Sequence, residues 1–326
     1  MNKNLDKVWN YKPDIPLANP SLFRTSLSLG LILSWFFKNW ISFSEKIFLL
    51  IVAVICWALI YPDLEKAKIF EFNWVFQIWL ANFTIMVFFT GSLHLYFYTF
   101  KKQANKLKFD HRSLTKKSWL YSFSNQVHDN IFWSLTSGVA QLTAFQAVTY
   151  WLMANGISPC FKKISDYPLW FPILFVLLPI WSAFHFYWIH RLLHIPILYK
   201  YVHSLHHRNV NVGPWSGLSM HPIEHFLYIS SLCLHWILLS HPLHVIFHVL
   251  YLGPGAAMTH CGYESLLVKD KKRLELGTFY HQLHHRYYEC NYGNQEMPWD
   301  RWFGTFHDGS EACTKKIREI KKSMHY

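Results

Sequence analysis

Charged side chains are scarce in this sequence: 15% of its 326 residues are Asp, Glu, Lys or Arg, against about 25% in soluble domains. Hydrophobic residues make up 52% of the chain and aromatic residues 19%. This composition excludes an ordinary soluble domain and favours an integral membrane protein. Acidic residues are the scarcer kind, since 31 basic residues stand against 19 acidic ones, for a net charge of +12. We interpret the basic excess as contact with anionic lipid rather than nucleic acid.

Paired cysteines and a targeting signal are missing as well. The six cysteines stand apart, with no C-x-x-C pair, so the spacing predicts neither a disulfide framework nor a zinc knuckle. The first 20 residues are polar and contain three prolines. Because they lack an apolar run before a small-residue cleavage site, they do not resemble a signal peptide. We expect a loose N-terminal tail over residues 1–22.

Long apolar stretches recur along the chain. A helix that spans a bilayer needs ~20 mostly apolar residues, and several stretches reach or approach that length. The final stretch is broken by His241-Pro242, which suits a re-entrant pair of helices better than one straight span. The sequence therefore predicts an all-α, polytopic helical membrane protein. The candidate stretches are 27–40, 47–61, 74–100, 131–154, 169–189 and 223–252.

The loop from 101 to 130 predicts the orientation. It contains seven Lys and Arg residues against two Asp, so the positive-inside rule places it in the cytoplasm. If 131–154 leads out and 169–189 returns, the chain re-enters the cytoplasm at His190. A re-entrant pair over 223–252 then keeps the rest of the chain on the same side. We expect a histidine-rich, metal-binding cap on the cytoplasmic face.

Histidines are concentrated in that cap, with 16 of the 21 falling between His185 and His285. Within the clusters they stand at i, i+3 and i+4, the spacings that share a helix face. Adjacent histidines diverge by about 100° on a helix, so one helix can serve two metal ions. Imidazole suits zinc, copper or iron, and zinc closes at about four ligands, so two metals are predicted. The clustered histidines are His190, His194, His203, His206, His207, His281, His284 and His285.

Two alternatives remain open at this point. A pair of structural zinc ions would use the same ligands without redox chemistry. A zinc hydrolase would need a general-base glutamate as in H-E-x-x-H, and no cluster contains one. Isolated histidines are interpreted as structural rather than metal-binding; they are His94, His235, His244 and His248.

The cluster order H-x-x-x-H, H-x-x-H-H, H-x-x-H-H resembles the sterol desaturase / fatty acid hydroxylase superfamily of membrane di-iron proteins. His203 follows His194 by nine positions, and His281 follows His207 by 74. The resemblance covers roughly 169–305. Flanking motifs that share it are Tyr187-Trp188, Arg191, His221-Pro222-Ile223-Glu224, His260-Cys261-Gly262-Tyr263, Asn291-Tyr292-Gly293 and Trp299-Asp300-Arg301-Trp302-Phe303-Gly304-Thr305.

The resemblance implies roles for individual residues. It makes the eight clustered histidines metal ligands and His260 a ninth ligand. His221 and His225 are implied as further ligands or as supports of the ligands, while Glu224 and Asp300 would orient ligand imidazoles through their second nitrogen. Many members carry an acidic residue shortly before the Tyr-Trp pair, where this chain has His185 nearby instead.

The implied activity is O2-dependent oxidation of a C–H bond in a lipid, either hydroxylation or desaturation, by an oxidoreductase with two iron ions that zinc can replace on purification. A sterol-like substrate is favoured, with fatty acyl, sphingolipid and carotenoid substrates as alternatives, and a structural zinc-binding membrane protein as the non-enzymatic one. Neither H-P-G-G nor G-x-G-x-x-G occurs, so electrons would come from a separate ferredoxin or cytochrome b5 type protein and its reductase. The expected segments are the tail 1–22, transmembrane helices and a basic loop over 23–168, the catalytic domain 169–305 and a basic tail 306–326.

Overall fold

The computed structural model describes residues 9–18, 28–294 and 296–324. This part of the chain is mostly helical, as predicted, but it also contains a short antiparallel hairpin that the all-α prediction missed: β1 (Ser265–Val268) and β2 (Lys271–Glu275). The α-helices are α1 (Leu29–Phe36), α2 (Glu45–Leu59), α3 (Phe72–His94), α4 (Gln126–Trp133), α5 (Val139–Ala154), α6 (Trp170–Leu193), α7 (Pro196–Leu198), α8 (Ser204–His207), α9 (Pro222–Ile229), α10 (Leu234–Ile237), α11 (Pro242–Leu252), α12 (Pro254–Thr259), α13 (Phe279–Tyr287), α14 (Trp299–Trp302) and α15 (Glu311–Met324).

Among the residues that the structure describes, two helices are long and apolar enough to cross a membrane: Phe72–Thr99, which is α3 with the π-helical turn η5 (Leu95–Thr99), and α6. A third span is available if the bent pair Leu29–Ile41 and Glu45–Leu59 forms one crossing, with its 43° bend at the break. The predicted candidate at 131–154 is not among them by length and composition, and the stretch predicted as a re-entrant pair, 223–252, is not one long helix.

An aromatic stripe runs along the first half of α3. Phe72, Phe76, Trp79 and Phe83 stack in sequence, with ring centroids 5.2–5.6 Å apart. Their spacing of three or four residues places them on one face, and Phe72 and Phe76 are exposed. The other face of α3 packs on α5, while α2 packs on α11. An exposed apolar face of this kind suits contact with lipid.

The stretch 223–252 is broken as predicted at His241-Pro242. The His241 side chain accepts a hydrogen bond from Leu243 N and caps α11, and Pro242 occupies the first helical position. At the turn before α11, Ser240 N donates to Pro159 O in the loop between α5 and α6. Glu224 on α9 and His260 after α12 both lie at the opposite end, beside clustered histidines. The broken pair thus starts and finishes on the histidine side.

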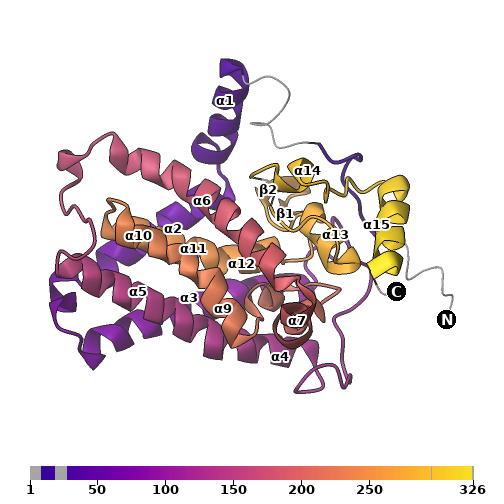
Figure 1. Ribbon diagram of the computed structural model, residues 1–326, viewed down its shortest axis with the longest axis horizontal. Coiled ribbons are helices and arrows are strands. Elements are labelled where there is room, and N and C mark those ends of the chain that lie inside the picture. Colours follow the sequence, from indigo (N-terminus) through magenta and orange to yellow (C-terminus); the bar gives the residue numbers. More distant parts are fainter. Residues whose placement is uncertain (1–8, 19–27, 295, 325–326) are drawn as a thin grey trace.

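The predicted basic loop lies at the same end of the molecule as the clustered histidines. Tyr98 donates to the carbonyls of Val212 and Cys261, and Gln126 Nε2 donates to Asn209 Oδ1 over 3.0 Å. In Figure 1, α13, α14, α15 and the hairpin form the part on the right, and α2, α3, α5, α6 and α11 form the bundle on the left.

The described part of the predicted tail, residues 9–18, forms no helix or strand but contacts the rest of the protein, while 1–8 and 19–22 lie outside the described residues. Leu17 is buried, and Asn10 Nδ2 donates to Lys108 O over 2.7 Å. The Arg286 guanidinium lies 3.7 Å from the centre of the Trp9 ring. Aromatic and cationic contacts anchor this segment, and the sequence pattern of polar residues and prolines gave no sign of them.

Candidate metal centre

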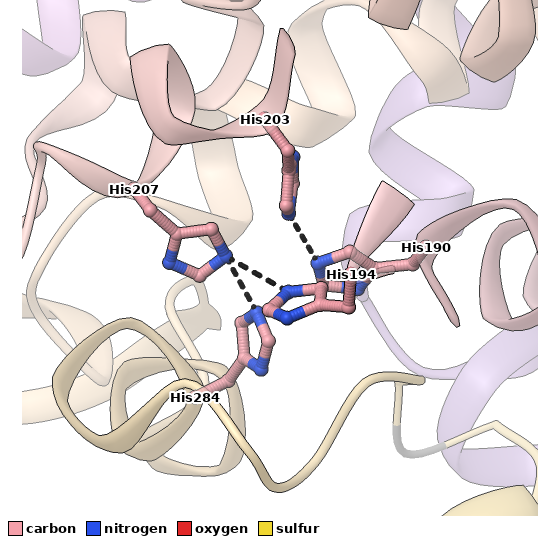
Figure 2. Close-up of side chains that lie close together, drawn as sticks. All are labelled: His190, His194, His203, His207 and His284. Atoms are coloured by element: carbon pink, nitrogen blue, oxygen red, sulfur yellow. Dashed lines mark hydrogen bonds between the residues drawn. The ribbon is translucent and has the colours of Figure 1, made fainter. Parts of the chain in front are cut away.

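Nine histidines converge in two groups at the end of α6. In the first histidine group, the nearest ring nitrogens of all five members lie within 4.8 Å of one another, and the same limit holds for the four members of the second. The first group is drawn in Figure 2, where its rings point toward a common centre. Every one of the nine histidines was a predicted ligand. The first group is His190, His194, His203, His207 and His284; the second is His206, His260, His281 and His285.

Helix geometry explains how neighbours in sequence reach different groups. His206 and His207 follow each other on α8 and diverge into the second and first groups, as His284 and His285 do on α13. Residues one apart on a helix point about 100° from each other. His281 and His285, four apart on α13, share the second group. One turn of helix therefore serves both groups.

Hydrogen bonds fix the tautomers of several first-group rings. His190 Nδ1 lies 2.5 Å from the Tyr292 carbonyl oxygen, and His284 Nδ1 lies 2.6 Å from the Cys290 carbonyl oxygen. A carbonyl only accepts, so each Nδ1 must carry the proton, leaving a lone pair on Nε2. His203 Nδ1 lies 2.8 Å from Glu224 Oε1, which gives the same tautomer beside a carboxylate. This pattern is common for metal-bound histidine.

The second group follows the same rule. His260 Nδ1 donates to the Ala256 carbonyl over 2.9 Å, and His206 Nδ1 donates to the Ser219 carbonyl over 3.3 Å. Their Nε2 atoms are directed inward, and His260 Nε2 lies 2.9 Å from His281 Nε2. His285 Nε2 is 3.1 Å from His281 Nε2. The ring nitrogens are thus packed as closely as in the first group.

These contacts fit a metal ion better than they fit hydrogen bonds between imidazoles. His190 and His203 both carry their proton on Nδ1, yet their Nε2 atoms lie 3.0 Å apart. Two facing lone pairs repel unless a cation lies between them. Nitrogens bound to one ion at ~2.1 Å lie roughly 3.0–3.4 Å apart, depending on geometry. The separations in both groups match that distance, so the donor set fits two metal ions.

Burial keeps these imidazoles neutral, as a ligand must be. It lowers the pKa of His206 to about 4, with the Ser219 carbonyl acting weakly in the opposite direction. Burial likewise lowers the pKa of His260 to about 3, and the neighbouring His206 adds to the effect. Both rings are therefore uncharged at neutral pH and present a free lone pair.

Glu224 is placed as the resemblance implied, while Asp300 acts one step further away. Glu224 is buried and contacts His203. The Asp300 carboxylate accepts from Tyr292 N and Gly293 N, over 2.8 and 2.7 Å, and contacts no imidazole in the described part of the chain. It holds the backbone of Tyr292, whose carbonyl in turn receives the His190 proton. The expectation that Asp300 itself touches a ligand ring is therefore wrong.

His221 and His225 lie outside both groups. His225 uses both ring nitrogens, with Nδ1 3.0 Å from Ser137 Oγ and Nε2 3.0 Å from the Leu218 carbonyl. His221 caps α9 by accepting from Ile223 N. His185 forms a hydrogen bond with Ser230 rather than with His190 or His194. These three histidines therefore have structural roles, because their hydrogen bonds hold loops and helix ends around the centre.

The carbonyls of Tyr292, Cys290, Ser219 and Ala256 are functional groups that sequence reasoning missed. Backbone carbonyls leave no pattern in a sequence, because every residue has one. The Asn291-Tyr292-Gly293 motif was the available signal for Tyr292. Arg191 lies 4.6 Å from the centre of the Tyr292 ring, which further fixes that segment.

A largely apolar pocket of about 900 Å³, including its open mouth, adjoins both groups. His190 and His203 reach it from the first group, and His206, His260 and His281 reach it from the second. Apolar lining residues include Phe186, Ile189, Leu193, Met220 and Leu252. An apolar molecule in this pocket would lie against both histidine groups.

Comparison with known proteins gives concordant matches. Residues 175–305 match the family model described as fatty acid hydroxylase. A Delta(7)-sterol-C5(6)-desaturase of Nicotiana tabacum is 31% identical over 183 residues, covering 53% of this chain and 65% of that protein. A Delta(7)-sterol 5(6)-desaturase of Schizosaccharomyces pombe is 29% identical over 236 residues, covering 69% of this chain and 73% of that protein. A Gibberella zeae homologue with the same activity in its name is 30% identical over 156 residues, and 47% of its length is covered. No solved structure matched significantly.

Fold and site together define a class: a mostly helical protein with helices of membrane-spanning length and two histidine groups that could each hold a metal ion. Within that class, residues 175–305 are similar to the fatty acid hydroxylase family, and the chain is similar to sterol C5(6) desaturases.

Proposed function

We propose that this protein is a membrane-bound, O2-dependent oxidoreductase that introduces a double bond into a sterol. The observation that carries this proposal is the pocket, because its apolar walls end at imidazoles from both histidine groups. The named activities of the matched relatives, sterol C5(6) desaturases, support a sterol rather than the fatty acyl, sphingolipid or carotenoid alternatives. Hydroxylation is the alternative outcome of the same chemistry.

The nine histidines are proposed as ligands of two iron ions, which when bound would supply reduction of O2 and removal of hydrogen from carbon. The chain's own residues prepare that site. Glu224 and the backbone carbonyls hold Nδ1 protons so that several of the rings turn their lone pairs inward. These rings are His190, His203, His206, His260 and His284. Phe186, Ile189 and Leu193 position an apolar substrate on the end of α6 and keep water from the centre.

A desaturation consumes one O2 and releases two water molecules. Two hydrogen atoms come from neighbouring C–H bonds of the lipid, which becomes an alkene. The other two arrive as two electrons from a separate donor protein and two protons from solvent. We propose a ferredoxin or cytochrome b5 type donor with its reductase, docking on the basic loop 101–125 on the cytoplasmic face.

Sterol analysis of membranes with and without the protein tests the proposal. We expect a new sterol with one additional double bond, formed only with O2 and a reductant, in membranes from cells that express this chain. A product with an added hydroxyl group would instead indicate hydroxylation.

Metal analysis distinguishes the proposed iron enzyme from a structural zinc protein, and it is needed because an all-histidine donor set also suits zinc. Stable zinc, no oxygen uptake and no recovery of activity on adding iron would contradict the proposal and favour a structural zinc protein.

A further inference from the structure

One acidic side chain lies in the pocket away from both histidine groups. Glu45 is the first residue of α2 and lines the pocket together with the histidines, but it belongs to neither histidine group. Its carboxylate has no hydrogen-bond partner within the described residues. The neighbouring Lys46 is engaged elsewhere, since its ammonium lies 2.6 Å from Glu296 and 3.0 Å from Asn39 Oδ1. A polar group that faces apolar walls without a partner is costly, so this position suits a ligand that donates a hydrogen bond.

A tyrosine hydroxyl accompanies the carboxylate. Tyr251 lines the same pocket and lies close enough for the Glu45 charge to act on its hydroxyl. The Tyr251 hydroxyl makes no hydrogen bond within the part of the chain that the structure describes. Tyr228, the third polar group on this side, already donates to the Leu252 carbonyl over 3.0 Å. Glu45 can accept and Tyr251 can donate, which is the complement of a hydroxyl group.

The distance from this pair to the metal centre limits the ligand. A methyl group built on Gly255 would lie 3.3 Å from Glu45 Oε1, so the carboxylate rests against the start of α12. His260 follows Gly255 by five residues, which on a helix is about 7 Å along the axis. Along α12, the backbone that the carboxylate rests against is thus about one and a half helical turns from a residue of the second histidine group.

We infer that Glu45 and Tyr251 form a hydroxyl-binding subsite that selects 3-hydroxysterols and determines which ring carbon faces the histidines. This inference rests on the proposed function and specifies its substrate. In a sterol, few bonds separate the 3-hydroxyl from carbons 5 and 6, which matches the short distance along α12. A fatty acyl chain has no hydroxyl at that distance from a carbon in mid-chain.

Binding measurements on the full-length protein in lipid nanodiscs test the subsite directly. The probes are a tritiated Δ7-sterol with a free 3-hydroxyl and its 3-methyl ether, which cannot donate a hydrogen bond. We expect the wild type to bind the free sterol about 10- to 100-fold more tightly than the ether, because the ether leaves a buried acceptor unpaired. Equal binding of the two sterols, or binding of neither, overturns the inference.

Variants identify the residues responsible. Glu45→Leu should bind both sterols alike, whereas Glu45→Gln, which keeps an accepting carbonyl, should retain the preference. Tyr251→Phe should weaken binding of the free sterol by about tenfold. The control is Glu71→Leu, at an exposed acid just before α3, which should behave as wild type. If Glu45→Leu still binds the free sterol more tightly than the ether, the proposed subsite is wrong. If that variant fails to fold, binding of the two sterols by the wild type and by Glu45→Gln still tests the subsite.

Product analysis on the same preparations separates this inference from the proposed function. Hydroxyl-dependent binding without any oxidised sterol would support the subsite and contradict the proposed activity. Oxidation of the free sterol and the ether at equal rates would support the activity and overturn the subsite.

Discussion

Five of the nine imidazoles in the two histidine groups are oriented by an atom that no metal would touch. His190, His203 and His284 carry their protons toward a carbonyl or a carboxylate and their lone pairs toward the centre. Such partners raise ligand basicity and restrict ring rotation. The first group is not uniform, since His194 Nδ1 and His207 Nδ1 are buried without a hydrogen-bond partner among the described residues. Those two rings are held by packing and would depend more on the metal for their orientation.

Loss of one ligand should disable the centre. We expect His284→Ala to reduce activity by about 100-fold or more and to lower bound metal, because the ring shares the first group with four others. Inductively coupled plasma mass spectrometry and product formation measure the two effects. His244→Ala is the matched control, since His244 is equally buried but bonds to the Phe171 carbonyl. Full activity of His284→Ala would contradict the ligand assignment.

Removal of the Glu224 carboxylate should loosen the first group without removing a ligand. We expect Glu224→Leu to lose metal 10- to 100-fold more readily to a chelator, because His203 loses the partner that fixes its tautomer. Glu224→Gln keeps an acceptor and should lie between this variant and wild type. Glu275→Leu, at an exposed acid paired with Lys38 on the surface, is the control. Equal metal retention in all four proteins would show that Glu224 does not support the centre.

Much of the site could be predicted at the level of single residues, and the reason is local. Spacings of three and four place side chains on one helix face wherever the helix lies, so the eight clustered histidines could be named before the fold was known. His260 was named only through the resemblance to the superfamily. Which acceptor receives each Nδ1 proton depends on long-range packing, as with His190 and Tyr292, 102 positions apart. Asp300 was misplaced for a different reason: its partners are the backbone amides of Tyr292 and Gly293, eight and seven positions earlier, and backbone amides leave no pattern in a sequence.

At the scale of elements, close backbone packing holds the walls of the pocket together. The 3-10 turn η9 (Pro214–Leu218) lies against α12, the helix that leads to His260. A Cβ on Gly217 would lie 2.2 Å from the Ala256 carbonyl oxygen, and that same oxygen accepts the His260 proton. Contact between two elements is thus coupled to the orientation of a second-group imidazole. The sequence could not predict this, since a glycine alone does not reveal which backbone approaches it.

Adding one methyl group at this contact should therefore affect both stability and metal. We expect Gly217→Ala to destabilise the protein by about 3 kcal/mol, because backbone atoms rather than a flexible side chain must move. Thermal unfolding in detergent and metal content of the purified protein are the measurements. Gly91→Ala is the control, because its Cβ would lie an ordinary 3.9 Å from Trp215. Unchanged metal content and unfolding temperature in Gly217→Ala would exclude the coupling.

At the scale of the whole molecule, α6 connects two opposite ends. Its 24 residues span about 36 Å, longer than the ~30 Å hydrocarbon core of a bilayer. The loop at its start lies beside the turn before α11, and its end carries the first histidine group. The basic stretch 101–130 contacts the segment just after His206 and His207, where Arg208 pairs with Asp129. The sequence predicted this shared end from loop charge, whereas the number of complete crossings is harder to predict because buried apolar helices and membrane helices have similar compositions.

Cysteine accessibility should therefore place the basic loop and the histidine clusters on one side of the membrane. We expect cysteines introduced at Ser204 and Lys106 to react with an impermeant maleimide from the same side in sealed vesicles. A cysteine at Ser165, in the loop before α6, should react only from the other side, because that helix separates Ser165 from the histidines. All three positions are exposed, so differences in labelling report the membrane rather than burial. Labelling of Ser204 and Lys106 from opposite sides would overturn the orientation, and with it the docking of an electron donor beside the metal centre.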